Sequence, residues 1–179
     1  MLTISGLHGS GKSTYARAIA QAYGLRLVSA GRFFRRIANE KGITIEQLTA
    51  RASKDPGIDR LIDYMTMQEA EKGNVVLDGQ LSGWMAREKA DVKIFLTAPD
   101  DVRFKRIAMR DRISIEDARM QTLMREAAQK ERFVRYYGID PFDVSNYDVV
   151  FDTSLQPLDE NIKILKNIIS EYLAEKSKK

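Results

Sequence analysis

The sequence contains no cysteine, and this absence excludes disulfide bonds and thiolate metal sites. No apolar run approaches the length of a membrane-spanning helix, so we expect no membrane association. Because the first predicted strand begins at Leu2, we also expect no secretory signal peptide. Internal repeats and low-complexity segments are absent. These features together favour a globular protein of the cytoplasm.

The length and composition fit one domain. The positions of the charged residues are more informative than the net charge. The chain has 179 residues, of which 44% are hydrophobic and 30% are charged. Its net charge is only +4 (29 − 25), but eight arginines lie between Arg103 and Arg135. Such a cluster could bind nucleic acid, form a solvated helix face or bind a small polyanion.

A phosphate-binding loop is predicted near the N-terminus, where the sequence fits the P-loop pattern G-x-x-x-x-G-K-[ST]. An apolar segment that reads as a buried strand precedes it, and an amphipathic helical stripe follows it. The loop comprises Gly6, Leu7, His8, Gly9, Ser10, Gly11, Lys12, Ser13 and Thr14. Its glycines permit the close approach of backbone N–H groups to phosphate. The alternative is a glycine turn with an ordinary surface lysine, but the strand and helix on either side favour phosphate binding.

The P-loop pattern predicts that the protein binds ATP and Mg²⁺. Lys12 is expected to reach the β- and γ-phosphates, and the Ser13 hydroxyl is expected to bind Mg²⁺. Residues 75–78 read as a buried strand that ends in Asp78. In an open α/β sheet the ligand lies beyond the carboxyl ends of the strands, so Asp78 should face the loop and help to hold the metal. The alternative role for Asp78 is to cap a turn before Gly79.

The remaining pattern predicts an α/β fold of the P-loop NTPase type. Strands are expected at residues 2–5, 25–28, 75–78, 92–98 and 147–152, in a five-stranded parallel sheet with helices on both faces. We expect a single domain with a core at about 1–32, 73–110 and 141–179. Helical insertions at about 33–72 and 111–140 lie after strand ends, where an acceptor-binding lobe and a closing lid would sit. Residues 176–179 are expected to form a frayed tail.

Among P-loop proteins, a small kinase fits this chain best. The D-x-x-G and N-K-x-D motifs of signalling GTPases do not occur in it. Arginines would neutralise a donor triphosphate and an anionic acceptor. A second group, Arg32, Arg35, Arg36 and Arg60, favours a phosphate acceptor over a hydroxyl acceptor, although each could be an ordinary surface residue. An RNA-associated ATPase is the alternative from another class, and the separation of the two arginine groups argues against it.

Four blocks of the sequence resemble the archaeal-type cytidylate kinases. They are residues 6–14, the Ser-Ala-Gly-Arg-Phe-Phe-Arg run at 29–35, the Asp-Gly-Gln-Leu-Ser-Gly-Trp-Met run at 78–85, and residues 125–140. The resemblance implies Mg²⁺-dependent phosphoryl transfer from ATP to CMP or dCMP, in a nucleoside-monophosphate-kinase fold with a CMP-binding lobe and a lid. Another small kinase, acting on AMP, UMP, dTMP or a hydroxyl metabolite, is the alternative. We expect small nucleotides as the only partners, no nucleic acid, and a monomer.

The resemblance also implies roles for individual residues. Arg35 would hold the CMP phosphate, and Asp78 would lie beside the metal. Arg125 and Arg132 would belong to the lid. Arg106 and Arg110 would lie near the donor nucleotide. We assign catalysis to Lys12, Arg125, Arg132 and Asp78. We assign acceptor binding to Ala30, Arg35, Arg60, Gln80 and Ser82.

Gln80 departs from the family pattern, in which arginine follows the Asp-Gly pair. We expect Gln80 and Ser82 to read the cytosine edge instead. His8 is expected to shape the loop or contact the donor rather than to act as a general base. Tyr136 and Tyr137 are expected to pack under the lid rather than to stack on a base.

Overall fold

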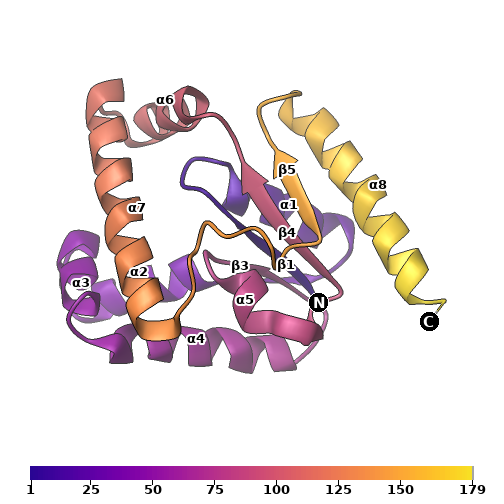
Figure 1. Ribbon diagram of the computed structural model, residues 1–179, viewed down its shortest axis with the longest axis horizontal. Helices are drawn as coiled ribbons and strands as arrows, with labels where there is room; N and C mark the ends of the chain where they lie inside the picture. Colours follow the sequence, from indigo (N-terminus) through magenta and orange to yellow (C-terminus); the bar gives the residue numbers. More distant parts are fainter. Residues whose placement is uncertain (179) are drawn as a thin grey trace.

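The computed structural model describes residues 1–178, in which five parallel strands form one sheet in the order β2-β3-β1-β4-β5 (Figure 1). The strands are β1 (Leu2–Gly6), β2 (Arg26–Ser29), β3 (Val75–Asp78), β4 (Val92–Thr97) and β5 (Val149–Asp152). The three central strands are buried almost throughout because helices cover both of their faces. The predicted α/β fold and parallel five-stranded sheet are confirmed.

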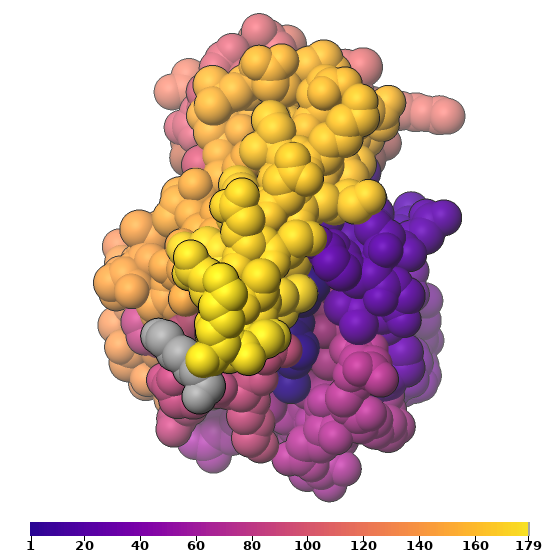
Figure 2. All heavy atoms as spheres, turned by 90° about the vertical axis from the view of Figure 1, so that its right-hand side faces the viewer, coloured from indigo at the N-terminus to yellow at the C-terminus, as the bar shows by residue number. Residues whose placement is uncertain are grey.

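The helices divide between the two faces of the sheet and two insertions. Within residues 1–178 they are α1 (Lys12–Ala22), α2 (Ala30–Glu40), α3 (Ile45–Ala52), α4 (Pro56–Glu71), α5 (Ser82–Ala86), α6 (Asp100–Asp111), α7 (Ile115–Tyr137) and α8 (Leu158–Lys176). On one face Ile19 of α1 packs with Leu165 and Ile169 of α8. Figure 2 shows the yellow helix α8 lying along the surface of the molecule. On the other face Ala70 of α4 and Ala86 of α5 close a second apolar cluster.

Some boundaries differ from the prediction for local reasons. α4 begins at Pro56, within the helical insertion expected at about 33–72, because the Asp55 side chain accepts a hydrogen bond from the Gly57 N–H and proline suits the first turn. β5 begins at Val149 rather than residue 147. The Tyr147 N–H closes a turn with the Val144 carbonyl instead of joining the sheet. The five-residue helix α5 was not predicted.

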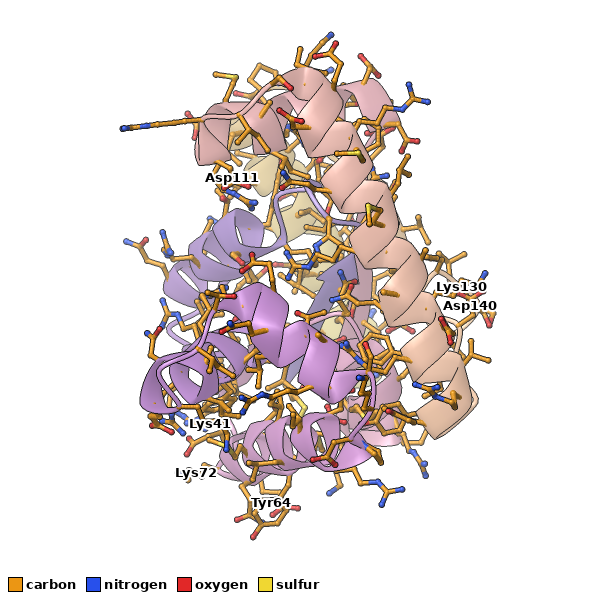
Figure 3. The ribbon with its side chains drawn as sticks, turned by 90° about the vertical axis from the view of Figure 1, so that its left-hand side faces the viewer. Lys41, Tyr64, Lys72, Asp111, Lys130 and Asp140 are labelled. Atoms are coloured by element: carbon orange, nitrogen blue, oxygen red, sulfur yellow. The ribbon has the colours of Figure 1, made fainter. Side chains whose placement is uncertain are left out.

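The first insertion, which holds α2 to α4, and the second, which holds α7, touch each other. Figure 1 shows α7 running from α6 to the neighbourhood of α3 and α4. The Tyr136 hydroxyl donates to the Ala52 carbonyl at 3.1 Å, and the Tyr137 hydroxyl donates to Asp63 on α4. On the outer side of the same helix end, Lys130 forms an ion pair with Asp140 (Figure 3). The end of the predicted lid helix therefore rests on the predicted acceptor lobe.

Within residues 1–178, no helix combines the length and apolar character needed to cross a bilayer. Of the predicted tail at 176–179, Lys179 lies outside the described residues.

Candidate active site

The P-loop forms a backbone cradle that only glycine permits at its key positions. Gly6 and Gly11 have positive φ angles of 144° and 90°. A Cβ atom on Gly6 would lie 2.0 Å from the Leu96 carbonyl oxygen, so no side chain fits there. α1 begins at Lys12 with no side-chain cap and no acidic residue in its first turn. Its first N–H groups are therefore suited to bind an anion.

Asp78 faces this cradle, as the sequence predicts. The Ser13 hydroxyl donates to Asp78 Oδ2 at 2.9 Å, and the Ser29 hydroxyl donates to the same oxygen at 3.1 Å. Lys12 Nζ donates to the Leu7 carbonyl at 2.8 Å. Burial lowers the pKa of Lys12 to about 8, although the negative charge of Asp78 opposes this shift. A lysine, a hydroxyl and a carboxylate thus meet beside the cradle. The two oxygen ligands fit Mg²⁺, which prefers one or two carboxylates together with phosphate and water.

The two groups of arginines converge on the same region. Burial lowers the pKa of Arg125, and the positive charges of Arg110, Arg132 and Arg35 lower it further. The positive charge of Arg125 in turn lowers the pKa of Lys12. Because interactions between charges weaken with distance, these shifts indicate that Arg35, Arg110 and Arg132 lie near Arg125, and that Arg125 lies near Lys12. Such a concentration of positive charge is suited to polyphosphate.

Arg132 is the most deeply buried member of this group. Its side chain is 4% exposed, and its Nε atom lies 2.7 Å from Asp59 Oδ2 on α4. Within residues 1–178 neither Nε nor Nη1 of Arg132 has a hydrogen-bond partner, so the contact with Asp59 is an ion pair without an aligned hydrogen bond. Arg132 therefore links α7 to α4, and its Nη1 remains a donor for a further acceptor, such as a phosphate oxygen.

A pocket lies on the acceptor side of β3. It is bounded by the start of α2, by α4 and by α5. Its walls include Ala30, Leu77 and Met85 as apolar residues, and Asp63, Thr66 and Ser82 as polar ones. Apolar walls with a few polar groups are typical of sites for small organic ligands. The cavity volume is about 20 Å³, room for a water molecule, so the walls would have to move apart to admit a nucleobase.

The comparisons with known proteins assign the family. The sequence profile described as "Cytidylate kinase-like family" matches residues 1–155. The chain belongs to this family. A protein named cytidylate kinase from Staphylothermus marinus is 45% identical to this chain over 175 residues, covering 98% of this chain and 99% of that protein. Another protein of that name, from Desulfurococcus amylolyticus, is 42% identical over 176 residues, covering 98% of this chain and 95% of that protein.

A solved structure of another kinase shares the fold. A shikimate kinase from Bacteroides thetaiotaomicron has a TM-score of 0.63 and 16% identity, covering 94% of this chain and 97% of that one. This likeness concerns the fold alone. It places the cytidylate kinase-like chain within an architecture that other P-loop kinases also use.

The structure gives Arg106 a bracing position. Its guanidinium donates to the Thr153 hydroxyl at 2.8 Å and to the Thr153 carbonyl at 3.0 Å. The Thr153 hydroxyl in turn donates to the Ser10 carbonyl at 2.9 Å. Arg106 thus links the P-loop to the segment after β5, next to the predicted donor site.

Four other residues predicted to bind nucleotide in the cytidylate kinase-like site, Thr14, Arg35, Arg60 and Arg110, are exposed. Arg110 is exposed and forms an ion pair with Asp111 at 2.7 Å. Arg60 and Thr14 are exposed on α4 and α1. Arg35 is exposed on α2, and its guanidinium lies close to Gly31 in the first turn of the same helix.

Gln80 and Ser82, which the sequence pairs as readers of one base edge, point to different places. Ser82 lines the pocket, whereas Gln80 Nε2 lies 3.1 Å from His8 Nε2. His8 Nε2 also lies 2.7 Å from Gln129 Oε1 on α7. Burial, with the positive charges of Lys12 and Arg125, lowers the pKa of His8 to about 2. A neutral, hydrogen-bonded His8 is suited to shaping the loop and is a very weak base.

Sequence reasoning missed an ion pair that joins the loop to α7. The Arg103 side chain is 3% exposed and its Nη1 atom donates to Glu126 at 2.7 Å and to the His8 carbonyl at 2.8 Å. Glu126 also accepts a hydrogen bond from the His8 N–H at 3.1 Å. In the sequence these residues appear only as members of a charged helical region. Their lack of a distinct local pattern explains why they were not found.

Proposed function

We propose that this chain transfers the γ-phosphoryl group of ATP to CMP, and to dCMP, giving ADP and CDP or dCDP. The observation that carries the proposal is that Lys12, Ser13 and Asp78 meet beside the P-loop, where the charge of Arg125 lowers the pKa of Lys12. The charges of Arg35, Arg110 and Arg132 in turn lower the pKa of Arg125, so cations of both insertions lie near this group. A donor triphosphate alone would not require cations from both insertions. The names of the relatives support a cytidine nucleotide as the acceptor.

The donor side is built from the P-loop and α1. The backbone N–H groups of the loop would hold the β- and γ-phosphates, and Lys12 would balance their charge. Ser13 and Asp78 would hold Mg²⁺, which supplies further neutralisation of the phosphate charge when it is bound. Arg106 keeps the loop in place from its far side through Thr153.

The acceptor side is built from the first insertion and the end of α7. Arg35 and the free donor of Arg132 would orient the phosphate of the acceptor toward the donor. This phosphate is already largely ionised at neutral pH, so no general base is required to activate it. Catalysis then consists of in-line positioning and charge neutralisation, with no covalent intermediate on the protein. Arg125 would stabilise the transferring group.

We also propose that residues 33–72 act as the acceptor lobe and residues 111–140 as the lid. The contacts of Tyr136 and Tyr137 with α3 and α4 support a closed arrangement in which both insertions cover the site. Closure would exclude water and so suppress hydrolysis of ATP.

An acceptor panel tests the proposed activity. Release of ADP from ATP and Mg²⁺ is measured with CMP, dCMP, UMP, AMP, dTMP and shikimate as acceptors, and with no acceptor. We expect the largest kcat/KM with CMP or dCMP and almost no release without an acceptor. A preference for any other acceptor contradicts the choice of substrate. Release of ADP that does not depend on an acceptor contradicts kinase activity altogether.

A further inference from the structure

The pocket beside β3 contains one carboxylate that the phosphate-transfer machinery does not use. Asp63 lies on α4, one turn after Asp59, and contributes to the pocket together with Thr66 and Ser82. Asp59 is paired with Arg132, whereas Asp63 has no ion-pair partner within residues 1–178. A half-buried carboxylate with no cation paired to it requires a separate explanation.

One oxygen of Asp63 is fixed by a hydrogen bond from α7, and the other accepts no hydrogen bond from the described residues. The Tyr137 hydroxyl donates to Asp63 Oδ2 at 2.5 Å. Among the described residues, no other hydrogen bond reaches this side chain. The Thr66 hydroxyl gives its hydrogen to the Ile62 carbonyl at 2.7 Å, so it does not donate to Asp63. Oδ1 is therefore an acceptor without a hydrogen bond, on a side chain that lines a pocket with largely apolar walls.

A carboxylate acceptor at this position would distinguish cytosine from uracil. The 4-position carries an amino donor in cytosine and a carbonyl acceptor in uracil, and aspartate accepts hydrogen bonds from the amino group of cytosine. A carboxylate would attract the amino group and would repel the carbonyl oxygen. The Ser82 hydroxyl, on the adjoining wall, can donate to the neighbouring ring nitrogen of cytosine.

We propose that Asp63, oriented by Tyr137, selects a 4-aminopyrimidine base in the acceptor nucleotide by accepting a hydrogen bond from its exocyclic amino group. This inference rests on the proposed phosphoryl transfer to a pyrimidine nucleotide. It assigns base selection to a residue of α4 rather than to Gln80, which lies against His8. It also makes selection depend on the position of α7, because Tyr137 belongs to that helix.

The first test compares kcat/KM for CMP and UMP in the wild type and in Asp63→Asn. The amide of asparagine can rotate to accept from an amino group or donate to a carbonyl, so the variant loses the preference. Hydrogen bonds to charged groups contribute about 1.5–3 kcal/mol, which corresponds to a fall of about 10- to 150-fold in the CMP-to-UMP ratio. A ratio within about twofold of the wild type, measured in a folded variant, overturns the inference.

Asp59→Asn is the matched control, because it removes the other carboxylate that links α4 to α7. It is expected to lower activity with CMP and UMP equally, through Arg132, and to leave their ratio unchanged. Tyr137→Phe keeps the carboxylate but removes its fixed orientation, so the ratio should fall by less than in Asp63→Asn. If Asp59→Asn changes the ratio as much as Asp63→Asn, the effect belongs to the packing of α7 and the inference fails.

A second test uses the wild type alone and measures how the CMP-to-UMP ratio of kcat/KM depends on pH. Burial raises the pKa of Asp63 to about 6, with the Asp59 charge adding to the shift and Tyr137 and Arg132 opposing it. Arg60 is the other charged group near the Asp63–Tyr137 pair. Below pH 6 the protonated carboxyl can donate to the uracil carbonyl, so the wild-type CMP-to-UMP ratio should fall between pH 7.5 and 5.5. The acceptor phosphate titrates alike in both substrates and cancels in the ratio. A ratio independent of pH contradicts the inference, whereas wild type that phosphorylates neither nucleotide contradicts the proposed function instead.

Discussion

The ion pair between Arg103 and Glu126 provides a stringent test of how the P-loop is supported. Glu126→Gln removes the charge but keeps an oxygen that can accept from the His8 N–H. Both side chains are less than one tenth exposed, at 3% and 9%. Removing one partner of a buried ion pair costs about 3–5 kcal/mol. Arg103 keeps Asp100 and the His8 carbonyl as partners, so we expect the lower end, about 3 kcal/mol of unfolding free energy.

The measurement is urea unfolding followed by circular dichroism, and Glu131→Gln is the control. Glu131 is exposed on the same helix, and its replacement should change the free energy of unfolding by less than about 0.5 kcal/mol. If the two variants are equally stable, Glu126 does not hold a buried charge pair.

The double variant Arg103→Met/Glu126→Leu separates lost charge pairing from lost packing. Apolar replacements fill the space and leave no unpaired buried charge, so the double variant should be at least about 1 kcal/mol more stable than the sum of the single effects predicts. Strictly additive effects of Arg103→Met and Glu126→Leu would refute the reasoning.

Three further predictions follow from individual residues. Lys12→Ala should lower kcat by orders of magnitude with an unchanged circular dichroism spectrum, and activity near wild type would refute the site assignment. Gly9→Ala should reduce both stability and ATP affinity, because a Cβ atom would lie 2.7 Å from the Arg103 carbonyl oxygen and φ is 78°; an unchanged melting temperature would contradict this. The folded-state pKa of Asp63 lies above its unfolded value, so the folded state holds this proton more tightly between about pH 4 and 6. The wild type should therefore lose stability relative to Asp63→Asn as the pH rises through that window, and parallel stability curves would contradict the shift.

Much of the fold could be predicted because it depends on local patterns. The glycine spacing of the P-loop reflects backbone conformations that other residues rarely adopt, and the structure shows such conformations at Gly6 and Gly11. Buried strands read as apolar runs, and β3 and β4 were found within a residue of their ends. The start of α3 also depends on a local pattern, the capping box formed by Thr44 and Gln47, which are three positions apart.

The parts that could not be predicted depend on contacts between distant residues. α5 has only five residues, too few to show a periodic apolar pattern in the sequence. Such a short helix depends on tertiary packing, here the burial of Ala86 in the apolar cluster on one face of the sheet. Asp63 lies in an amphipathic helix among other charged residues, so nothing in the sequence distinguishes it from a solvated carboxylate. Its contact with Tyr137 spans 74 positions. The direction of Gln80 toward His8 likewise results from how β3 and the P-loop meet in space.

The central claim is that one cradle and two groups of arginines bring two anionic nucleotides together. Calorimetric titration with a compound that joins adenosine and cytidine through five phosphates tests this claim most directly, because the compound would occupy both sites at once. We predict a Kd lower by at least about 100-fold than that of ATP or CMP alone, as expected for linked ligands. A Kd equal to that of ATP, with the cytidine end contributing nothing, would contradict the account.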